Sequence, residues 1–508
     1  MNKIVLYKSP LIRMLELKDF ETHVLFHNNK SYTVNDILRN AETIALNLTN
    51  NGFAEGDRAL LLAEPSIDFI STLYAIIMCK GVTAIIDPDM GNALYLSRLK
   101  QFRPDWIFID YRLALLQKFG WLQRLYRKIN PDAFFVPGVD NVRTVAMGRN
   151  LLFLNSMEHL DKFKSKIKTG CNWSTEKSEK EVLVTYTSGT LSEPKGVVHS
   201  DLSLVHSLEL LARKIEKYRG NNMVSYLPHF ALIGIMANVK VYLWKKDMPP
   251  SKRIAFIRKY DINIFFGPPV EMNEILDYCI ARNIPFPKSL KYILLGSAPI
   301  YQSFLSKLKQ FTDAEVECLY GMTENLLVSS ILSDEKLSYA GKGDIVGTPF
   351  DGVEVKIAQD NEILLRSKQL FKGYLHLPRR KENAFHPTGD LGFVDSQGRI
   401  VLTGRKKNMI IRKEYNIYPG LYEPVINSIP GVEQAVMLGH YNDQTADEEV
   451  FLIVQRSNSL SEKALIEFLK SDEYGIDTSA MPDHIIFATI PRKGRQQKID
   501  YQKLKELI

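Results

Sequence analysis

The chain has 508 residues, 45% of them hydrophobic and 24% charged, which is ordinary for a soluble globular protein. This length exceeds the roughly 250–300 residues at which a single core stops growing, so we expect two or more domains. The formal net charge is +7. No zinc-finger, basic-zipper or RNP pattern accompanies that charge, so we expect no nucleic-acid partner.

The four cysteines, Cys79, Cys171, Cys279 and Cys318, lie far apart and form no metal-binding or redox motif. We interpret them as reduced thiols of a cytoplasmic protein. Residues 1–17 lack the apolar core and cleavage site of a signal peptide. The most apolar stretch, 69–79, is too short to span a bilayer and is typical of a buried helix. We therefore expect no membrane insertion.

Short β-branched or apolar runs alternate with longer helical patterns up to about residue 404. The first predicted strand, 59–63, is followed by a helix at 67–80, and further strands are predicted at 82–86, 181–187, 222–227, 262–266 and 291–295. Strands that alternate with helices favour a doubly wound α/β architecture. Later strands at 353–358, 362–367 and 398–402 are separated by turns and indicate a smaller antiparallel sheet.

The pattern restarts after residues 404–408, with strands predicted at 431–438 and 449–455 and a helix at 461–471. We therefore predict an α/β protein with a large N-terminal domain at 1–404, a hinge at 405–408 and a small, mobile α+β domain at 409–508. A C-terminal domain of about a hundred residues is a typical domain size.

A polar loop follows the apolar run 181–184. Residues 185–196 read Thr-Tyr-Thr-Ser-Gly-Thr-Leu-Ser-Glu-Pro-Lys-Gly. Hydroxyl groups and backbone N–H groups in such a loop can converge on phosphate oxygens, and Lys195 adds a positive charge. The loop is not a Walker A motif, because Pro194 stands where that motif needs glycine. Alone, such a segment is more often an ordinary polar turn.

Other motifs accompany this loop in a characteristic order. They are Gly56-Asp57-Arg58, Asp87-Pro88, Tyr320-Gly321-Met322-Thr323-Glu324, Thr388-Gly389-Asp390, Gly404-Arg405-Lys406-Lys407, Asn416-Ile417-Tyr418-Pro419 and Lys498. With them the chain resembles the adenylate-forming superfamily, which unites acyl-CoA synthetases, peptide-synthetase adenylation domains and beetle luciferases. The resemblance covers essentially the whole chain. It implies an enzyme that uses ATP and Mg²⁺ to convert a carboxylic acid into an acyl-adenylate with release of pyrophosphate.

The resemblance also implies a role for each matched residue. Lys195 and the loop residues would hold the β- and γ-phosphates: Thr187, Ser188, Gly189 and Thr190. The adenine site would be framed by Gly296, Ser297, Ala298 and Tyr320, with Gly321 in the same nucleotide-binding set. Thr323 would touch the α-phosphate, and Glu324 would hold Mg²⁺, a cation that prefers oxygen ligands.

Four further positions belong to the catalytic and moving parts of such an enzyme. Asp390 would accept hydrogen bonds from both ribose hydroxyls, with Arg405 assisting at the ribose and phosphates. Lys498 would bridge the carboxylate and the α-phosphate; we prefer it to Lys493 because Lys-Ile-Asp matches the end of the family pattern. Lys407 would be the hinge, although a solvated loop lysine would look the same.

The acid-binding pocket is predicted in the segment after residues 227–228, with His229, Phe230, Ala231 and Gly234 as its members. Residues 221–244 contain no Asp or Glu, which disfavours an amino-acid substrate because its ammonium group would be unpaired. The apolar side chains favour a fatty or aryl acid. A helix that simply packs on the core would show the same pattern.

The acceptor of the acyl group stays open between coenzyme A and an acyl carrier protein, either of which presents a phosphopantetheine thiol. Lys413-Glu414 stands where thioester-forming relatives carry two glycines that let the pantetheine arm approach. Basic runs at 405–413 and 492–498 would suit an acidic carrier protein. Residues 86–91 and 230–232 resemble olefin β-lactone synthetases, so closure of a 3-hydroxy fatty acyl-adenylate is one alternative. A degenerate acyl- or nucleotide-binding protein is another.

Overall fold

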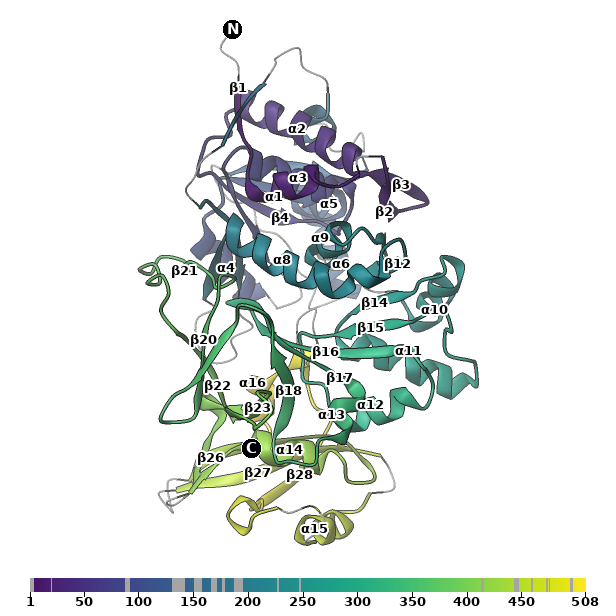
Figure 1. Ribbon diagram of the computed structural model, residues 1–508, viewed down its shortest axis with the longest axis vertical. Helices are drawn as coiled ribbons and strands as arrows, with labels where there is room; N and C mark the ends of the chain where they lie inside the picture. Colours follow the sequence, from purple (N-terminus) through teal and green to yellow (C-terminus); the bar gives the residue numbers. More distant parts are fainter. Residues whose placement is uncertain are drawn as a thin grey trace. The chain divides into compact units, whose positions relative to one another are not determined.

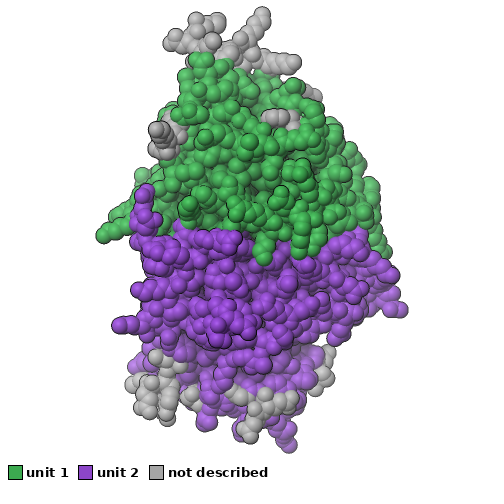
Figure 2. Space-filling view, viewed as in Figure 1, with its two compact units in different colours: residues 1–266, 323–326, 368–381 green, residues 267–322, 327–367, 382–508 purple. Residues whose placement is uncertain are grey.

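The computed structural model describes residues 4–19, 21–86, 92–129, 142–149, 158–165, 171–175, 179–186, 195–225, 228–245, 248–412, 415–442, 447–457, 460–471, 474, 476–493 and 497–508. These residues fall into two compact units. Unit 1 comprises residues 1–266, 323–326 and 368–381, and unit 2 comprises the remainder (Figure 2). Figure 1 labels the elements of both units. Among the described residues, no helix is both long and apolar enough to cross a bilayer.

The first sheet of unit 1 is mainly parallel. Its strands, in spatial order, are β21 (Gly373–Tyr374), β11 (Gly196–Ser200), β10 (Glu181–Tyr186), β5 (Val82–Ile85), β4 (Arg58–Leu62), β6 (Trp106–Asp110), β7 (Arg143–Met147) and β8 (Glu158–His159). Only the β10–β11 and β11–β21 pairs are antiparallel. The helices between these strands are α3 (Ile67–Met78), α4 (Asn92–Phe102), α5 (Tyr111–Lys118), α6 (Gly120–Ile129) and α7 (Leu160–Phe163).

A second group of strands in unit 1 runs in the order β14 (Ile264–Gly267), β12 (Asn222–Ser225), β13 (Lys240–Leu243), β2 (His23–His27) and β3 (Lys30–Thr33). A separate parallel pair joins β1 (Ile4–Tyr7) to β9 (Cys171–Ser174). The remaining helices of this unit are α1 (Pro10–Glu16), α2 (Val34–Asn50), α8 (Asp201–Ile215), α9 (Pro228–Met236) and α10 (Pro250–Lys259).

The start and burial of α3 follow from its sequence. The hydroxyl of Ser66 accepts a hydrogen bond from the Phe69 N–H at 3.1 Å, which caps the first turn. Every residue from Phe69 to Met78 is buried. The apolar run is therefore a core helix, as its length predicted.

Unit 2 begins with a parallel pair and continues into antiparallel strands. Its strands, in spatial order, are β15 (Tyr292–Leu295), β16 (Glu315–Met322), β17 (Asn325–Leu332), β18 (Asp344–Pro349), β23 (Ile400–Arg405), β22 (His386–Val394), β20 (Glu362–Arg366) and β19 (Glu354–Ile357). The helices of this part are α11 (Pro269–Arg282), α12 (Gln302–Lys309) and α13 (Ser333–Ser338). The predicted small antiparallel sheet corresponds to β19, β20, β22 and β23.

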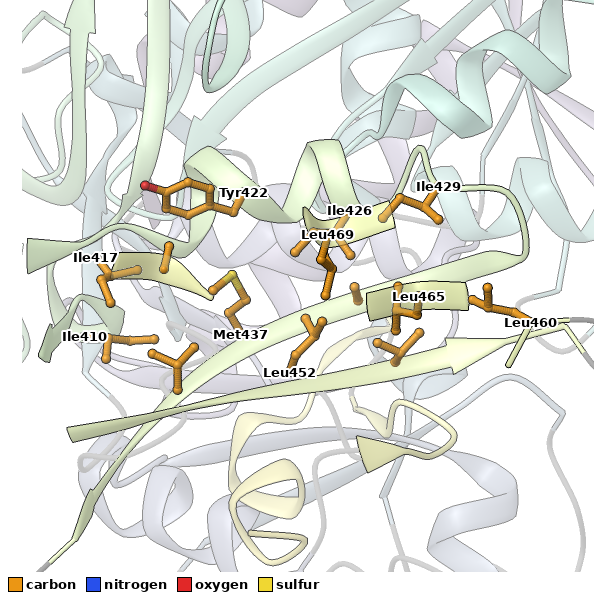
Figure 3. Packing of buried hydrophobic residues seen from close by; sticks show 14 residues of the cluster. Ile410, Ile417, Tyr422, Ile426, Ile429, Met437, Leu452, Leu460, Leu465 and Leu469 are labelled. Carbon is orange, nitrogen blue, oxygen red and sulfur yellow. The ribbon is translucent and has the colours of Figure 1, made fainter. Parts of the chain in front are cut away.

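The C-terminal segment has a hydrophobic core of its own (Figure 3). Its elements are β24 (Ile410–Arg412), β25 (Tyr415–Ile417), α14 (Pro419–Ile426), β26 (Val432–Asn442), β27 (Asp447–Arg456), α15 (Glu462–Lys470), β28 (His484–Phe487), β29 (Arg492–Lys493), β30 (Lys498–Ile499) and α16 (Tyr501–Lys505). Side chains such as Tyr422, Met437 and Leu465 converge between α14, α15 and the β26–β27 pair. This core supports a compact C-terminal segment; the domain boundary at 404 stays a prediction.

Candidate active site

The predicted phosphate loop joins two antiparallel strands. β10 and β11 pair from Glu181 opposite Ser200 to Tyr186 opposite Gly196, so the hairpin holds the two ends of the loop side by side. Thr187, Ser188, Gly189 and Thr190 lie outside the described residues.

The C-terminal end of this loop is anchored by β21. The Leu375 N–H donates to the Gly196 carbonyl at 2.7 Å, and the Lys372 N–H donates to the Val198 carbonyl at 2.8 Å. Lys195, directly before β11, places its ammonium group 4.9 Å from the ring centre of Tyr374. An aromatic face attracts a cation in this geometry. Lys195 is exposed, and its contact with Tyr374 fixes the direction of its side chain.

Tyr374 also holds the predicted metal ligand. Its hydroxyl donates to Oε1 of Glu324 at 2.9 Å, and the Phe371 N–H donates to the Glu324 carbonyl at the same distance. Glu324 is only 7% exposed. Burial and the neighbouring carboxylate raise the pKa of Tyr374, so its hydroxyl stays protonated and can donate. Sequence reasoning missed Tyr374, whose only signal was a Gly-Tyr pair well downstream of the loop.

The Glu324 carboxylate suits a magnesium ion that is bound by few protein side chains. Among the described residues, no three His, Cys, Asp or Glu side chains gather into a metal-binding group. Mg²⁺ usually takes one or two carboxylates and completes its shell with water and substrate phosphates. A carboxylate accepts several contacts at once, so the bond from Tyr374 is compatible with this role.

His199, which sequence reasoning also missed, connects this part of the site to Thr323. The side chain is 1% exposed, and its Nε2 lies 3.1 Å from Oγ1 of Thr185. A second hydrogen bond joins the ring to the Thr323 backbone, while burial lowers the pKa of His199 to about 4. The ring is therefore neutral near pH 7. Its signal in the sequence was one histidine in an otherwise apolar strand.

A second cluster, in unit 2, surrounds Asp390. Cross-strand pairing places Asp390 of β22 opposite Arg405 of β23, and the two side chains form an ion pair. The Tyr320 hydroxyl donates to Oδ2 of Asp390 at 2.5 Å. Asp390 is 2% exposed, and burial raises its pKa, although the charge of Arg405 and the bond from Tyr320 act in the opposite direction. The structure thus brings three of the predicted nucleotide-binding residues together.

Backbone contacts fix the turn that carries Asp390. Thr388 Oγ1 accepts from the Asp390 N–H at 3.0 Å and donates to the Ile363 carbonyl at 2.8 Å. The Gly389 N–H donates to Oε1 of Glu362 at 2.9 Å. Gly389 has a φ of +73°, which glycine adopts at little cost. Glu362 is a supporting residue that the sequence did not single out.

The predicted adenine segment follows β15. In the β15–β16 pair, Leu295, the last residue of β15, lies opposite Cys318. Residues 296–298 therefore follow the carboxyl end of β15, and Tyr320 lies on β16 two residues beyond Cys318. Ser297 has a φ of +72°, which marks a sharp bend at this end. Binding sites commonly form outside the carboxyl ends of parallel strands. Gly296, Ser297 and Ala298 therefore occupy positions suited to ligand contact, and Gly321 directly follows Tyr320 on β16.

The two candidate C-terminal lysines lie on neighbouring strands. Lys493 and Lys498 lie opposite each other on β29 and β30. Lys493 forms an ion pair with Asp500, with 3.1 Å between Nζ and Oδ1. This contact gives Lys493 a structural role within the segment; the choice of Lys498 stays a prediction. Burial and the charge of Arg405 lower the pKa of Lys407, so the predicted hinge residue lies within reach of the Asp390–Arg405 pair.

The predicted acid pocket corresponds to α9 in unit 1. His229, Phe230 and Ala231 lie on this helix, but their side chains are outside the described part of the structure. A Cβ on Gly234 would lie 2.3 Å from Val241 Cγ2 and 2.5 Å from Met223 Cε. Glycine therefore lets α9 pack closely on β12 and β13. At Gly234, α9 therefore packs on the core. The sequence alone is compatible with either core packing or a pocket at this position.

Comparison with known proteins adds a family to this geometry. A sequence family described as AMP-binding enzyme matches residues 17–375. A long-chain-fatty-acid–CoA ligase, FadD13 of Mycobacterium tuberculosis, is 26% identical over 330 residues, which is 61% of this chain and 64% of the relative. A 2-succinylbenzoate–CoA ligase of Listeria monocytogenes is 26% identical over 370 residues, covering 68% of this chain and 77% of the relative. The chain thus spans less than two thirds of the first of these relatives.

A solved structure matches almost the whole fold. The ATP-bound MatB of Rhodopseudomonas palustris superposes with a TM-score of 0.80 at 19% identity, covering 98% of each chain. The predicted fold class, with a large N-terminal α/β part and a smaller C-terminal part, is confirmed. At this identity the match describes the fold alone.

Proposed function

Because the chain belongs to the AMP-binding enzyme family, as its motifs predicted, we propose that it activates an apolar carboxylic acid as an acyl-adenylate. The acid is fatty or aryl, ATP supplies the AMP group, and pyrophosphate leaves. The acyl group then passes to a phosphopantetheine thiol of coenzyme A or of an acyl carrier protein, and AMP leaves. The observation that carries the proposal is the buried Asp390 held between Tyr320 and Arg405.

The Asp390 cluster suits a ribose. A carboxylate has about four acceptor sites on its two oxygens, so it can bind ribose hydroxyls while it keeps Tyr320 and Arg405. Those two neighbours hold the carboxylate in one orientation before ATP arrives, which lowers the entropy lost on binding. The Tyr320 ring offers a face for adenine stacking. Residues 296–298 would complete the adenine site.

The Glu324 cluster suits the phosphates. Attack of the carboxylate on the α-phosphorus forms the mixed anhydride and breaks the bond to pyrophosphate, so negative charge develops on phosphate oxygens. Lys195 and the loop residues would neutralise the β- and γ-phosphates, and Thr323 would contact the α-phosphate. Mg²⁺, held by Glu324, would supply further charge neutralisation when bound. His199 would keep Thr323 in place.

Lys498 is the proposed bridge between the two reacting groups. An ammonium placed between the carboxylate and the α-phosphate reduces their mutual repulsion and stabilises the charge that develops in the transition state. Lys407 would act as the hinge that changes the position of the C-terminal segment between the two half-reactions.

The acid class rests on sequence and on two relatives. The pocket segment lacks acidic side chains, and the two relatives are named for a long-chain fatty acid and for 2-succinylbenzoate. Both relatives are named as coenzyme A ligases, which supports a thiol acceptor. Lys413 and Glu414 replace the two glycines that thioester-forming relatives carry. An acyl carrier protein and an internal 3-hydroxyl are therefore tested as alternative acceptors.

A screen of pyrophosphate release tests acid and acceptor together. Fatty, 3-hydroxy fatty and aryl acids are each supplied with ATP and Mg²⁺, and with coenzyme A, acyl carrier protein or no acceptor. The proposal predicts thioester and multiple turnovers only with a thiol. Multiple turnovers with a 3-hydroxy acid and no thiol would identify lactone closure instead. Tight acyl binding without pyrophosphate release from any acid would identify a non-catalytic binding protein.

A further inference from the structure

The helix α6 presents an apolar side to solvent. Trp121 is 64% exposed, Leu125 is 52% exposed and Tyr126 is 43% exposed. With 3.6 residues per turn, Trp121 and Leu125 are one turn apart, and Leu122 and Tyr126 are the next such pair on the same side. These four residues form one apolar stripe, which we call the α6 face. Surface helices normally bury such a stripe against the core.

Basic residues border the α6 face. Arg124 and Lys128 are exposed on the Trp121 side of the stripe, because Arg124 follows Trp121 by three residues and Lys128 follows it by seven. Residues 113–129 contain four Lys or Arg and no Asp or Glu. Arg112, just before them, has its charge paired with Asp110 and Glu64 at 2.8 and 3.1 Å. The local excess of positive charge therefore belongs to the end of α5 and to α6.

An apolar and aromatic face, with only basic charge at its border, is the pattern of a helix that lies in a membrane interface. Tryptophan and tyrosine favour the headgroup region, where the ring is buried and its polar edge stays wet. Basic side chains extend from the same helix toward anionic headgroups. A protein surface usually carries charges of both signs. The headgroups of an anionic bilayer are uniformly negative, so they match the basic residues of α6.

We propose that α6, with the end of α5, docks the protein on the surface of an anionic lipid bilayer. The helix lies parallel to the surface with the α6 face toward the acyl chains. In this arrangement the association is peripheral, because the helix lies on the surface and does not cross the bilayer. The inference concerns binding to lipid and does not depend on the proposed activity.

Vesicle co-sedimentation with the full chain tests this. The probes are phosphatidylcholine vesicles with and without phosphatidylglycerol. We expect the protein to pellet with the anionic vesicles and to be released at high salt, because screening weakens attraction to headgroups. In the wild type, vesicles should shift tryptophan emission to the blue, and Trp121→Phe should remove that shift.

Two double variants separate the apolar and basic contributions. Trp121→Ser with Leu125→Ser, and Arg124→Gln with Lys128→Gln, should each weaken binding on the order of ten-fold. Because these side chains are exposed, the fold should survive. The matched controls, Ile280→Ser on α11 and Lys252→Gln with Arg258→Gln on α10, should bind as the wild type does.

Three outcomes would overturn the proposal. The first is absence of binding to either vesicle, and the second is equal binding by the wild type and both double variants. The third is self-association that the Trp121→Ser and Leu125→Ser changes abolish, without vesicle binding, which would assign the face to a second copy of the chain. Pyrophosphate release in solution is measured separately, so failure here leaves the proposed function untouched.

Discussion

The carboxylate of Asp390 depends on neighbours that come from other strands. Tyr320 reaches it from β16 and Arg405 from β23, and both contacts offset the cost of burying its charge. Single substitutions at this scale remove one contact while they leave the backbone in place. Their effects therefore report how strongly each neighbour holds the ribose-binding group.

Tyr320→Phe removes only the hydroxyl that donates to Asp390. Because a hydrogen bond to a charged group is worth about 1.5–3 kcal/mol, the free energy of unfolding should fall by that amount. The KM for ATP should rise as well, since Asp390 loses its fixed orientation. Urea unfolding and initial-rate kinetics measure the two effects. Tyr278→Phe on α11 is the control, and equal behaviour of the two variants would contradict this role for Tyr320.

His199 predicts a loss of stability in acid. Its pKa in the folded protein is about 4, below the usual 6.5, so the unfolded chain binds the extra proton between these values. Stability from neutral His199 is therefore complete above pH 6.5 and lost as the pH falls to 4, by about 3 kcal/mol in total. His199→Gln removes the titrating group, so the unfolding midpoint of this variant should depend less on pH over this range. An unchanged pH profile in the variant would show that another group controls acid stability.

The packing of α9 on β12 and β13 depends on one glycine. Gly234 lets the helix lie against Val241 and Met223, where a methyl group would collide with both. Gly234→Ala should lower the free energy of unfolding by about 1–3 kcal/mol, the usual cost of overpacking. Gly120→Ala is the matched control, because nothing lies within 4 Å of a Cβ there. Equal stability of Gly234→Ala and the wild type would argue for a pocket at this position.

A partly buried acid connects α14 to the strand that follows it. Glu423 Oε1 accepts from the Met437 N–H at 2.9 Å, and burial raises the pKa of Glu423 from 4.5 to about 7. The folded state therefore keeps a proton that the unfolded chain has lost, and stability falls as the pH rises from about 4.5 through 7. The ring of Tyr301 and that of Tyr501 are the other titratable groups nearby.

Glu423→Gln should remove this dependence, because the amide stays neutral and its oxygen can still accept from Met437. The unfolding midpoints of variant and wild type should agree near pH 5 and diverge near pH 8, with the variant more stable. Differential scanning calorimetry at several pH values measures this. A variant that is less stable at pH 8 would show that the charged form is the favoured one.

Sequence patterns predicted the elements better than the contacts between them. Runs such as 59–63 and 353–358 became β4 and β19 because β-branched and apolar residues suit a pleated, half-buried strand. The partners Tyr374, His199 and Glu362 were missed. Each contacts the site across strands that are distant in sequence, and such contacts depend on strand register, which one sequence does not reveal. Motif order therefore identified the candidate site residues but not their support.

At the scale of the whole molecule, the chain returns to unit 1 twice after it has entered unit 2. Residues 323–326 and 368–381 belong with the first 266 residues. These two short returns carry Thr323, Glu324 and Tyr374, while Asp390 and Arg405 belong to unit 2. The pattern of strands and helices restarts near residue 404, so the sequence predicts one boundary there. Short returns carry no composition signal, so the sequence could not show them.

Exchange of labelled pyrophosphate into ATP tests the central claim, acyl-adenylate formation, most directly. With an apolar acid and Mg²⁺ and without any acceptor, the wild type should catalyse acid-dependent exchange. Lys498→Ala should reduce the exchange rate on the order of 10²–10³-fold, whereas Lys493→Ala, which loses the ion pair with Asp500, should reduce it far less. Absence of exchange with every fatty and aryl acid, or full exchange in Lys498→Ala, would contradict the account.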